Sequence, residues 1–99
     1  MRVIARSSLS DYGERHPNLR PSLDHWYRLK KAKSWTTIQE AASTFSKAKI
    51  LNGERIRFEI GDGCRLIVAF DFHHQIAFVK FVGTHAEYDR IDALNVSMF

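Results

Sequence analysis

The spacing of hydrophobic residues changes along the chain from a helical to an alternating pattern. In the first half, a helical interval separates Leu23, Trp26 and Leu29. This spacing predicts a helix over residues 21–33, opened by Pro21. From Arg55 onward, hydrophobic residues alternate with charged ones and then form longer apolar runs. The pattern therefore predicts helices first and strands second.

Three pairs of residues have the composition of a helix-opening capping box, in which a hydroxyl residue precedes an acidic residue by three positions. The pairs are Ser8 with Asp11, Thr37 with Glu40, and Thr84 with Glu87. The first predicted helix ends by His16, because Pro17 restrains the residue before it. The second covers residues 38–42, and the third begins at His85 and runs to about Leu94.

The alternating pattern predicts three consecutive antiparallel strands. Residues 55–60 alternate, the Gly-Asp-Gly sequence at 61–63 supplies a turn, and residues 64–71 form an apolar run. A polar connection at 72–75 leads into another apolar run at 76–82. With a short first strand at 2–5, these elements predict an α+β protein, with N-terminal helices packed on a small, mainly antiparallel sheet and a short C-terminal helix.

Length and composition indicate one domain over residues 1–99. The chain has 99 residues, of which 44% are hydrophobic, and it shows no repeat or linker. Its single cysteine, Cys64, excludes an internal disulfide and fits a reducing compartment. No run of about 18 apolar residues and no export signal is present. We therefore expect a cytoplasmic protein that is neither exported nor embedded in a membrane.

Basic residues are concentrated in the first part of the sequence. Residues 1–57 hold 12 Lys/Arg against 5 Asp/Glu, a net charge of +7, whereas residues 58–99 hold 3 against 6, a net charge of −3. This asymmetry favours a surface that binds a polyanion such as RNA or the ribosome. The alternative is a basic face that only keeps the protein soluble.

Two groups of residues are candidates for chemistry. Arg65 begins an otherwise apolar run, and a three-residue turn places it opposite Glu59, on the face that carries Arg57. His85, Tyr88 and Asp89 lie on one face of the predicted C-terminal helix, because they are three and four positions apart.

These side chains suffice for cleaving RNA without a metal. The reaction needs activation of the ribose 2′-hydroxyl, stabilisation of charge at the phosphate, and a proton for the leaving 5′-oxygen. Histidine and tyrosine transfer protons, and arginine binds phosphate. Each residue also has a structural alternative: His85 as an exposed first-turn residue, Tyr88 as core packing, and Arg65 as the partner of Glu59 in a salt bridge.

Basic stretches beside aromatic residues are candidates for RNA binding. They contain Lys30, Lys31, Lys47 and Lys49, near Trp26, Tyr27 and Trp35. Their alternative is a solvated helix face beside core aromatics. We expect no cofactor and no metal site, because His73 and His74 lack ligand spacing and a lone cysteine builds no zinc site. No nucleotide-binding loop or serine-hydrolase motif occurs.

The C-terminal half resembles the HigB toxin family within the RelE-like group. The resemblance lies in Phe58-Glu59-Ile60, in Cys64-Arg65-Leu66-Ile67-Val68, and in residues 79–89, which read VKFVGTHAEYD. It extends to the Trp26/Trp35 region and the loop before the second of the expected strands, and so spans nearly the whole chain. The string Thr-His-Ala-Glu-Tyr-Asp at 84–89 is its most specific part.

The resemblance implies a RelE-like fold, ribosome-dependent cleavage of mRNA, and silencing by a HigA-type antitoxin that carries a helix-turn-helix domain. Contact with DNA is then indirect, through the antitoxin. By position, Arg65 matches the family's phosphate-handling arginine, and Lys80 occupies a position that is often basic. Glu59 and Gly63 stand where the family commonly has asparagines. Two other functions stay open at this point: a non-catalytic RNA- or ribosome-binding module, and a subunit of a repressor complex.

Overall fold

A five-stranded sheet forms the centre of the protein. The computed structural model describes residues 1–32, 34–61 and 63–99, and the side chains of residues 30–32 lie outside this description. The strands are β1 (Arg2–Ile4), β2 (Ala48–Ile50), β3 (Arg55–Ile60), β4 (Cys64–Asp71) and β5 (Ile76–Thr84), in the order β1-β5-β4-β3-β2. β1 runs parallel to β5, and every other neighbouring pair is antiparallel. The predicted α+β architecture with a mainly antiparallel sheet is confirmed.

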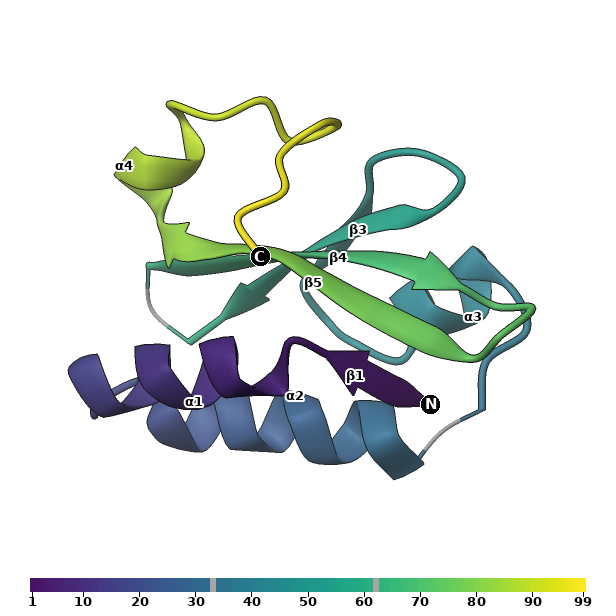
Figure 1. Cartoon of the computed structure of the whole chain (residues 1–99), viewed down its shortest axis with the longest axis horizontal. Helices are drawn as coiled ribbons and strands as arrows, with labels where there is room; N and C mark the ends of the chain where they lie inside the picture. The colour runs from purple at the N-terminus through teal and green to yellow at the C-terminus, as the bar shows by residue number, and fades with distance from the viewer. Residues whose placement is uncertain (33, 62) are drawn as a thin grey trace.

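The helices lie on both sides of this sheet. They are α1 (Arg6–Arg15), α2 (Arg20–Ala32), α3 (Ile38–Ser43) and α4 (His85–Tyr88). Figure 1 shows α1 and α2 side by side beneath the sheet, whereas α4 and the C-terminal segment lie above it. None of the described helices is both long and apolar enough to cross a membrane. The sheet therefore has one face covered by α1 and α2, and a second face on which α4 and the chain end lie.

Large aromatic side chains fill the space between the helices and the sheet. The Trp26 ring meets the Phe58 ring edge-on at 5.4 Å, and the Trp35 ring meets Phe70 at 5.9 Å. Trp26 and Phe58 are each only 1% exposed. These contacts join α2 and the segment before α3 to β3 and β4, and aromatic pairs of this geometry stabilise a core beyond the area they bury. The tryptophans are thus core residues. This agrees with the alternative in which the basic stretches form a solvated helix face beside core aromatics.

Some strand residues that point away from α1 and α2 form a second, smaller apolar layer. Ile67 lies between two residues that face the helices, so its side chain points to the second face, where it pairs with Phe81. Both are buried. Lys80 is left without a partner on β4, because the register shifts between Ile67 and Val68. This second face needs a cover, which α4 and the C-terminal segment provide.

Two of the predicted helix boundaries are wrong. α1 begins at Arg6, with Ala5 at its N-cap and no side-chain cap, so Ser8 lies inside the helix. The chain enters α1 directly from β1, whose pairing with β5 sets the direction of entry. α4 ends at Tyr88 instead of Leu94: the N–H groups of Arg90 and Ile91 bond three residues back, to the carbonyls of Glu87 and Tyr88. Asp92 then begins a separate turn, in which it accepts hydrogen bonds from the backbone N–H of Leu94 and the side chain of Asn95.

Two further differences concern short or undescribed segments. β2 was not predicted, since three residues are too short for a recognisable pattern. Lys33 at the expected end of the second helix, and Asp62 in the expected hairpin turn, lie outside the described residues. The other expected helices and strands are present, with ends within two residues of those predicted. α3 is capped by the Thr37 side chain, which accepts a hydrogen bond from the Glu40 backbone N–H at 3.2 Å.

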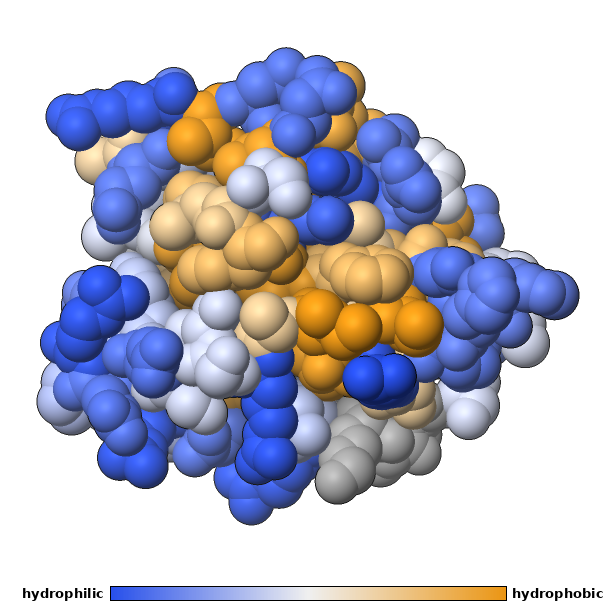
Figure 2. All heavy atoms as spheres, in the orientation of Figure 1, coloured by the Kyte–Doolittle hydropathy of each residue, from blue (hydrophilic) through white to orange (hydrophobic). Residues whose placement is uncertain are grey.

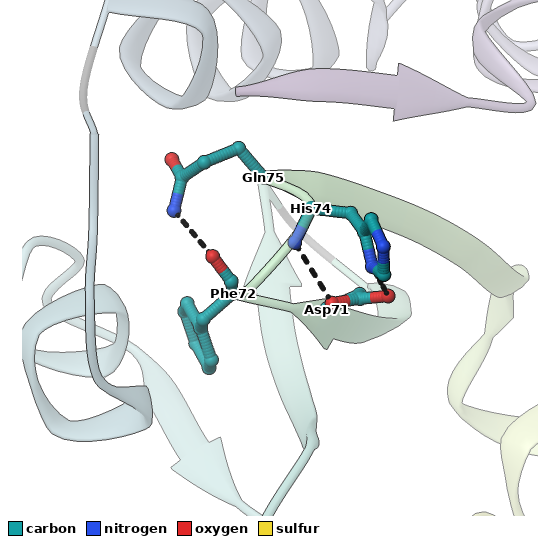
Figure 3. Close-up of polar contacts among 4 residues, drawn as sticks. All are labelled: Asp71, Phe72, His74 and Gln75. Atoms are coloured by element: carbon teal, nitrogen blue, oxygen red, sulfur yellow. Dashed lines mark hydrogen bonds and ion pairs between the residues drawn. The ribbon is translucent and has the colours of Figure 1, made fainter.

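The polar connection between β4 and β5 forms a tight turn (Figure 3). Asp71 accepts hydrogen bonds from the backbone N–H of His74 at 3.0 Å and pairs with its ring Nδ1 at 2.8 Å. These contacts lower the pKa of the Asp71 carboxyl, the backbone bond most. Gln75 adopts a positive φ of 55° and donates to the backbone carbonyls of Phe72 and Trp35. The two histidines therefore belong to an exposed turn.

Candidate active site

The hairpin register places three charged side chains together on the second face of the sheet. Arg57 and Glu59 are two residues apart on β3, so they point to the same side. Arg65 on β4 pairs directly with Glu59, as a three-residue turn predicts. Residues of the same strands that face the other way, including Phe58 and Leu66, are buried under the helices. Close to its turn, the hairpin thus places apolar residues on one face and charged residues on the other.

α4 brings two more side chains over this charged group. Thr84 opens the helix with a complete capping box: its hydroxyl accepts from the Glu87 backbone N–H at 3.1 Å, and the Glu87 carboxylate accepts from the Thr84 backbone N–H at 2.9 Å. That backbone N–H is the main reason why the pKa of Glu87 is lowered. The cap fixes the first turn of the helix, which carries His85 and Tyr88.

The Tyr88 ring lies over both arginines. Its centroid is 4.7 Å from the central guanidinium carbon of Arg65 and 5.6 Å from that of Arg57. The Phe81 ring contacts Tyr88 edge-on at 6.2 Å. A cation beside an aromatic face is attracted by the ring's electron density. Tyr88 therefore holds the two guanidinium groups together from above.

Glu59 lies at the centre of the group, which we call the arginine–histidine cluster: Arg57, Glu59, Arg65, His85 and Tyr88. One carboxylate oxygen of Glu59 is 3.2 Å from Nη2 of Arg65 and 3.9 Å from Nε2 of His85. The side chains of Arg65, Glu59 and His85 are 15%, 30% and 49% exposed. The cluster is thus shielded at its arginines and open to solvent at its histidine.

The cluster has an excess of positive charge with hydrogen-bond donors to spare. Two guanidinium groups face one carboxylate. The Nε atoms of both Arg57 and Arg65 are buried and donate to no described residue. Arginine binds phosphate oxygens through pairs of N–H groups, and a buried donor without an acceptor is costly. The arrangement favours an anion such as a phosphodiester beside the histidine.

The other predicted site residues, the RNA-binding lysines and the supporting residue Asp89, differ in where they lie relative to the cluster. Lys49 on β2 pairs with Arg57, and the Lys47 backbone carbonyl accepts from the Glu59 N–H, so both lysines border the cluster on the edge strand. Lys80 instead lies over the Phe78 ring, 5.4 Å from its centroid. Asp89 is an exposed cap at the end of α4. The side chains of Lys30 and Lys31 lie outside the description.

A groove opens at the sheet edge next to the cluster. It has a volume of about 530 Å³ and lies between α2 and the end of β3. Its lining includes Leu29, Phe45, Lys47, Glu59 and Ile60. Among the described residues, no three His, Cys, Asp or Glu side chains lie close enough to hold a metal ion. The groups that the arginine–histidine cluster itself offers for chemistry are two guanidiniums, an imidazole, a phenol and a carboxylate.

Arg55, a residue near the cluster, was not singled out by sequence reasoning. It is 8% exposed, a buried charged residue two positions before Arg57. Its Nη1 donates to the backbone carbonyls of Ala93 at 3.1 Å and Val96 at 2.8 Å. Its position at the start of an alternating strand resembles that of Arg57, so the sequence contains no signal that separates the two.

Comparison with known proteins identifies the family. Residues 19–91 match the model of the HigB toxin family, described as the RelE-like toxic component of a toxin-antitoxin system. The chain is also 27% identical over 94 residues to the mRNA interferase HigB of Escherichia coli O6:H1 (strain CFT073), an alignment that covers 92% of this chain and 91% of the relative. The matched region includes α2, α3, the strands β2 to β5 and the whole cluster. The chain belongs to the HigB family of RelE-like toxins, whose partners are antitoxins.

Proposed function

We propose that this toxin is a ribosome-dependent endoribonuclease that cleaves messenger RNA in the cytoplasm without a metal ion, and that a HigA-type helix-turn-helix antitoxin silences it. The observation that carries the proposal is the arrangement of Arg65 and His85 around the Glu59 carboxylate, with the Tyr88 ring over Arg65. The E. coli relative is named an mRNA interferase, which agrees with this activity.

The proposed reaction is attack of the ribose 2′-oxygen on the adjacent phosphorus. The 2′-hydroxyl loses its proton to a base, a bond forms between the 2′-oxygen and phosphorus, and the bond to the 5′-oxygen breaks. The leaving 5′-oxygen takes up a proton. The products are a 2′,3′-cyclic phosphate, which hydrolysis opens to a 3′-phosphate, and a 5′-hydroxyl.

Each residue of the arginine–histidine cluster has a role in this reaction. Arg65 binds the phosphate oxygens and stabilises the charge that develops on them, with Arg57 beside it. His85 is the leading proton-transfer group, because an imidazole both accepts and donates protons near neutral pH. Tyr88 orients the ribose or shares proton transfer. Glu59 holds Arg65 and orients His85 until the phosphate competes for the guanidinium.

The lysines at the sheet edge extend the proposed RNA surface. Lys47 and Lys49 are exposed and border Glu59 and Arg57. Flexible ammonium groups at this place contact phosphates on either side of the scissile bond and release their counterions. We include Lys80, Lys30 and Lys31 in this surface on the grounds of sequence alone.

The decisive experiment compares single-turnover cleavage of translated mRNA by the wild type with that by Arg65→Ala. We expect the rate of the chemical step to fall by about 10²–10³-fold, as on removal of other electrostatic stabilisers, while ribosome affinity changes little. Arg15→Ala is the matched control, since it removes an exposed arginine on α1.

Two further readouts separate this proposal from a non-catalytic RNA-binding module. Cleavage should survive EDTA at a magnesium level that keeps ribosomes intact, and the upstream fragment should end in a cyclic or 3′-phosphate. A 3′-hydroxyl end would contradict the mechanism. So would folded Arg65→Ala and His85→Ala variants that both cut at the wild-type rate. Inhibition of translation with intact mRNA would favour the binding module instead.

A further inference from the structure

We propose that Arg55 is a positioning residue for the active site: by fixing the C-terminal segment to β3, it holds Tyr88 over Arg65 and Arg57. The inference concerns the same site as the proposed function and rests on it for its catalytic consequence. Its structural part stands on the contacts of the free protein alone.

The first step is the contact itself. The guanidinium of Arg55 is buried and donates two hydrogen bonds to backbone carbonyls that are 38 and 41 residues away in the sequence. It also lies near the Asp92 carboxyl, whose pKa is lowered chiefly by the Asn95 side chain and the Leu94 N–H, with a smaller contribution from Arg55. A buried guanidinium is expensive unless its donors are satisfied. The contact therefore favours the conformation of the C-terminal segment in which both carbonyls face this guanidinium.

The second step is the structure of that segment. Asp92 accepts hydrogen bonds from Leu94 and Asn95, and its carbonyl accepts from the Val96 N–H at 2.8 Å. This turn presents two carbonyls, those of Ala93 and Val96, to the same guanidinium. Farther on, the Met98 N–H bonds to the Lys80 carbonyl of β5 at 2.9 Å. The segment is thus attached to both β3 and β5.

The third step links the segment to the arginine–histidine cluster. α4 has only four residues, too few to be stable on its own. Its N-terminal end is fixed by the Thr84 capping box, and four residues lie between Tyr88 and Ala93. Figure 1 shows α4 and the C-terminal segment following one another on the side of the sheet opposite to α1 and α2. Of the two attachments of this segment, the one made by Arg55 lies nearer in the sequence to Tyr88.

The fourth step is that β3 carries both Arg55, which attaches the segment, and Arg57, over which Tyr88 lies. Arg55 and Arg57 point to the same face of β3, and Tyr88 rests on Arg57. The distance between the attachment and the cluster is then fixed by two residues of extended backbone. Loss of the attachment should let Tyr88 move relative to both guanidinium groups, and displacements of about 1 Å suffice to slow a reaction about 10²-fold.

The test observes the Nε–H signals of arginine by NMR, in protein labelled with ¹⁵N-arginine. The Tyr88 ring over Arg65 should shift this signal by its ring current, and the buried Nε–H groups of Arg65 and Arg57 should exchange slowly enough to be seen. A Tyr88→Leu sample assigns the shift. In Arg55→Met, which keeps the side-chain length but removes the donors, we expect the shift to fall by about half or more, as Tyr88 samples other positions.

Activity gives the second readout. The rate of single-turnover cleavage by Arg55→Met should fall by about 10–10²-fold, while its ribosome affinity stays within about threefold of the wild type. Arg55→Lys keeps a donor, so it should recover part of the ring-current shift and part of the cleavage rate. Arg90→Met is the control, because it removes an exposed arginine from the same segment. If Arg55→Met does not fold, Asp92→Ala disrupts the turn from its exposed side and should reduce the ring-current shift.

The outcomes separate the two proposals. A folded Arg55→Met with wild-type ring-current shifts would overturn the positioning role, as would an unchanged shift in Asp92→Ala where Arg55→Met does not fold. If the wild type cleaves no RNA but the shift still depends on Arg55, the positioning of Tyr88 stands and the proposed function fails.

Discussion

At the scale of single residues, burial on the helix-covered face has a consequence for alkaline stability. Cys64 is fully buried, and burial raises the pKa of its thiol to about 11; the pKa of the neighbouring Tyr12 hydroxyl is also raised, mainly by burial. In the unfolded chain the thiol ionises near pH 9. The unfolded state therefore loses its proton first as pH rises, so stability is complete below pH 9 and declines between pH 9 and 11.

We expect the free energy of unfolding to fall by about 3 kcal/mol across this window on account of Cys64, from the shift of about two pH units. Urea unfolding at several pH values measures the decline. In Cys64→Ala, the part of the decline of the unfolding free energy with pH that is due to the thiol should vanish, while the part due to Tyr12 remains. Equal slopes in the two proteins would show that the thiol does not contribute. Alkylation of the native wild type at pH 8 should also be slow, and fast in urea.

The residues of the site differ in how far the sequence determines their neighbours. The pairing of Arg65 with Glu59 follows from turn length, because a three-residue turn fixes the hairpin register. The Tyr88 ring over Arg65 does not, since it depends on the direction in which a four-residue helix leaves β5. The pairing of Lys49 with Arg57 also required the structure, because β2 is too short to be recognised.

At the scale of elements, the capping box of α4 should matter more for activity than its stability cost suggests. Thr84→Ala removes the hydroxyl that accepts from Glu87, a change that costs about 1 kcal/mol at comparable N-caps. Because α4 carries His85 and Tyr88, fraying of its first turn should also slow cleavage. Thr37→Ala is the matched control, for it removes the equivalent cap of α3.

Thermal unfolding and single-turnover cleavage measure the two effects. Both variants should lose similar stability, but only Thr84→Ala should lose cleavage rate beyond about threefold, since misplaced catalytic groups affect the chemical step directly. An equal loss of rate in both variants would mean that α4 acts only through global stability.

The same elements show which boundaries can be predicted from sequence patterns and which cannot. The Thr84 box predicts the start of α4 correctly, because capping depends on residues three positions apart. Beyond Tyr88, the chain is held by the turn at Asp92 and by the distant Arg55, contacts that a local pattern does not contain, and the predicted helix was therefore too long. Likewise, entry into α1 follows the pairing of β1 with β5, two segments more than 70 residues apart. Local signals locate elements, and tertiary contacts set their ends.

At the scale of the whole molecule, the surface has features that suit a protein partner. Figure 2 shows hydrophobic side chains gathered in the middle of one face and surrounded by hydrophilic ones. Large apolar residues are exposed near the chain end, where Leu94, Met98 and Phe99 are 49%, 54% and 46% exposed. Exposed apolar areas with a polar border are typical of interfaces. A small domain also leaves part of its apolar surface unburied, which a partner can cover.

The antitoxin should therefore stabilise the toxin strongly. A ligand that binds only the folded state at a concentration 100 times its Kd adds about 2.7 kcal/mol, and each kcal/mol raises the Tm of a domain of this size by about 4–8 °C. We expect the cognate antitoxin to raise the Tm by about 10–20 °C, with an unrelated helix-turn-helix antitoxin as the control. The shift should grow with antitoxin concentration, since the gain follows mass action, and cleavage of translated mRNA should stop over the same range. A tight complex that still cleaves mRNA at the free toxin's rate would refute silencing by this partner, whatever its effect on Tm.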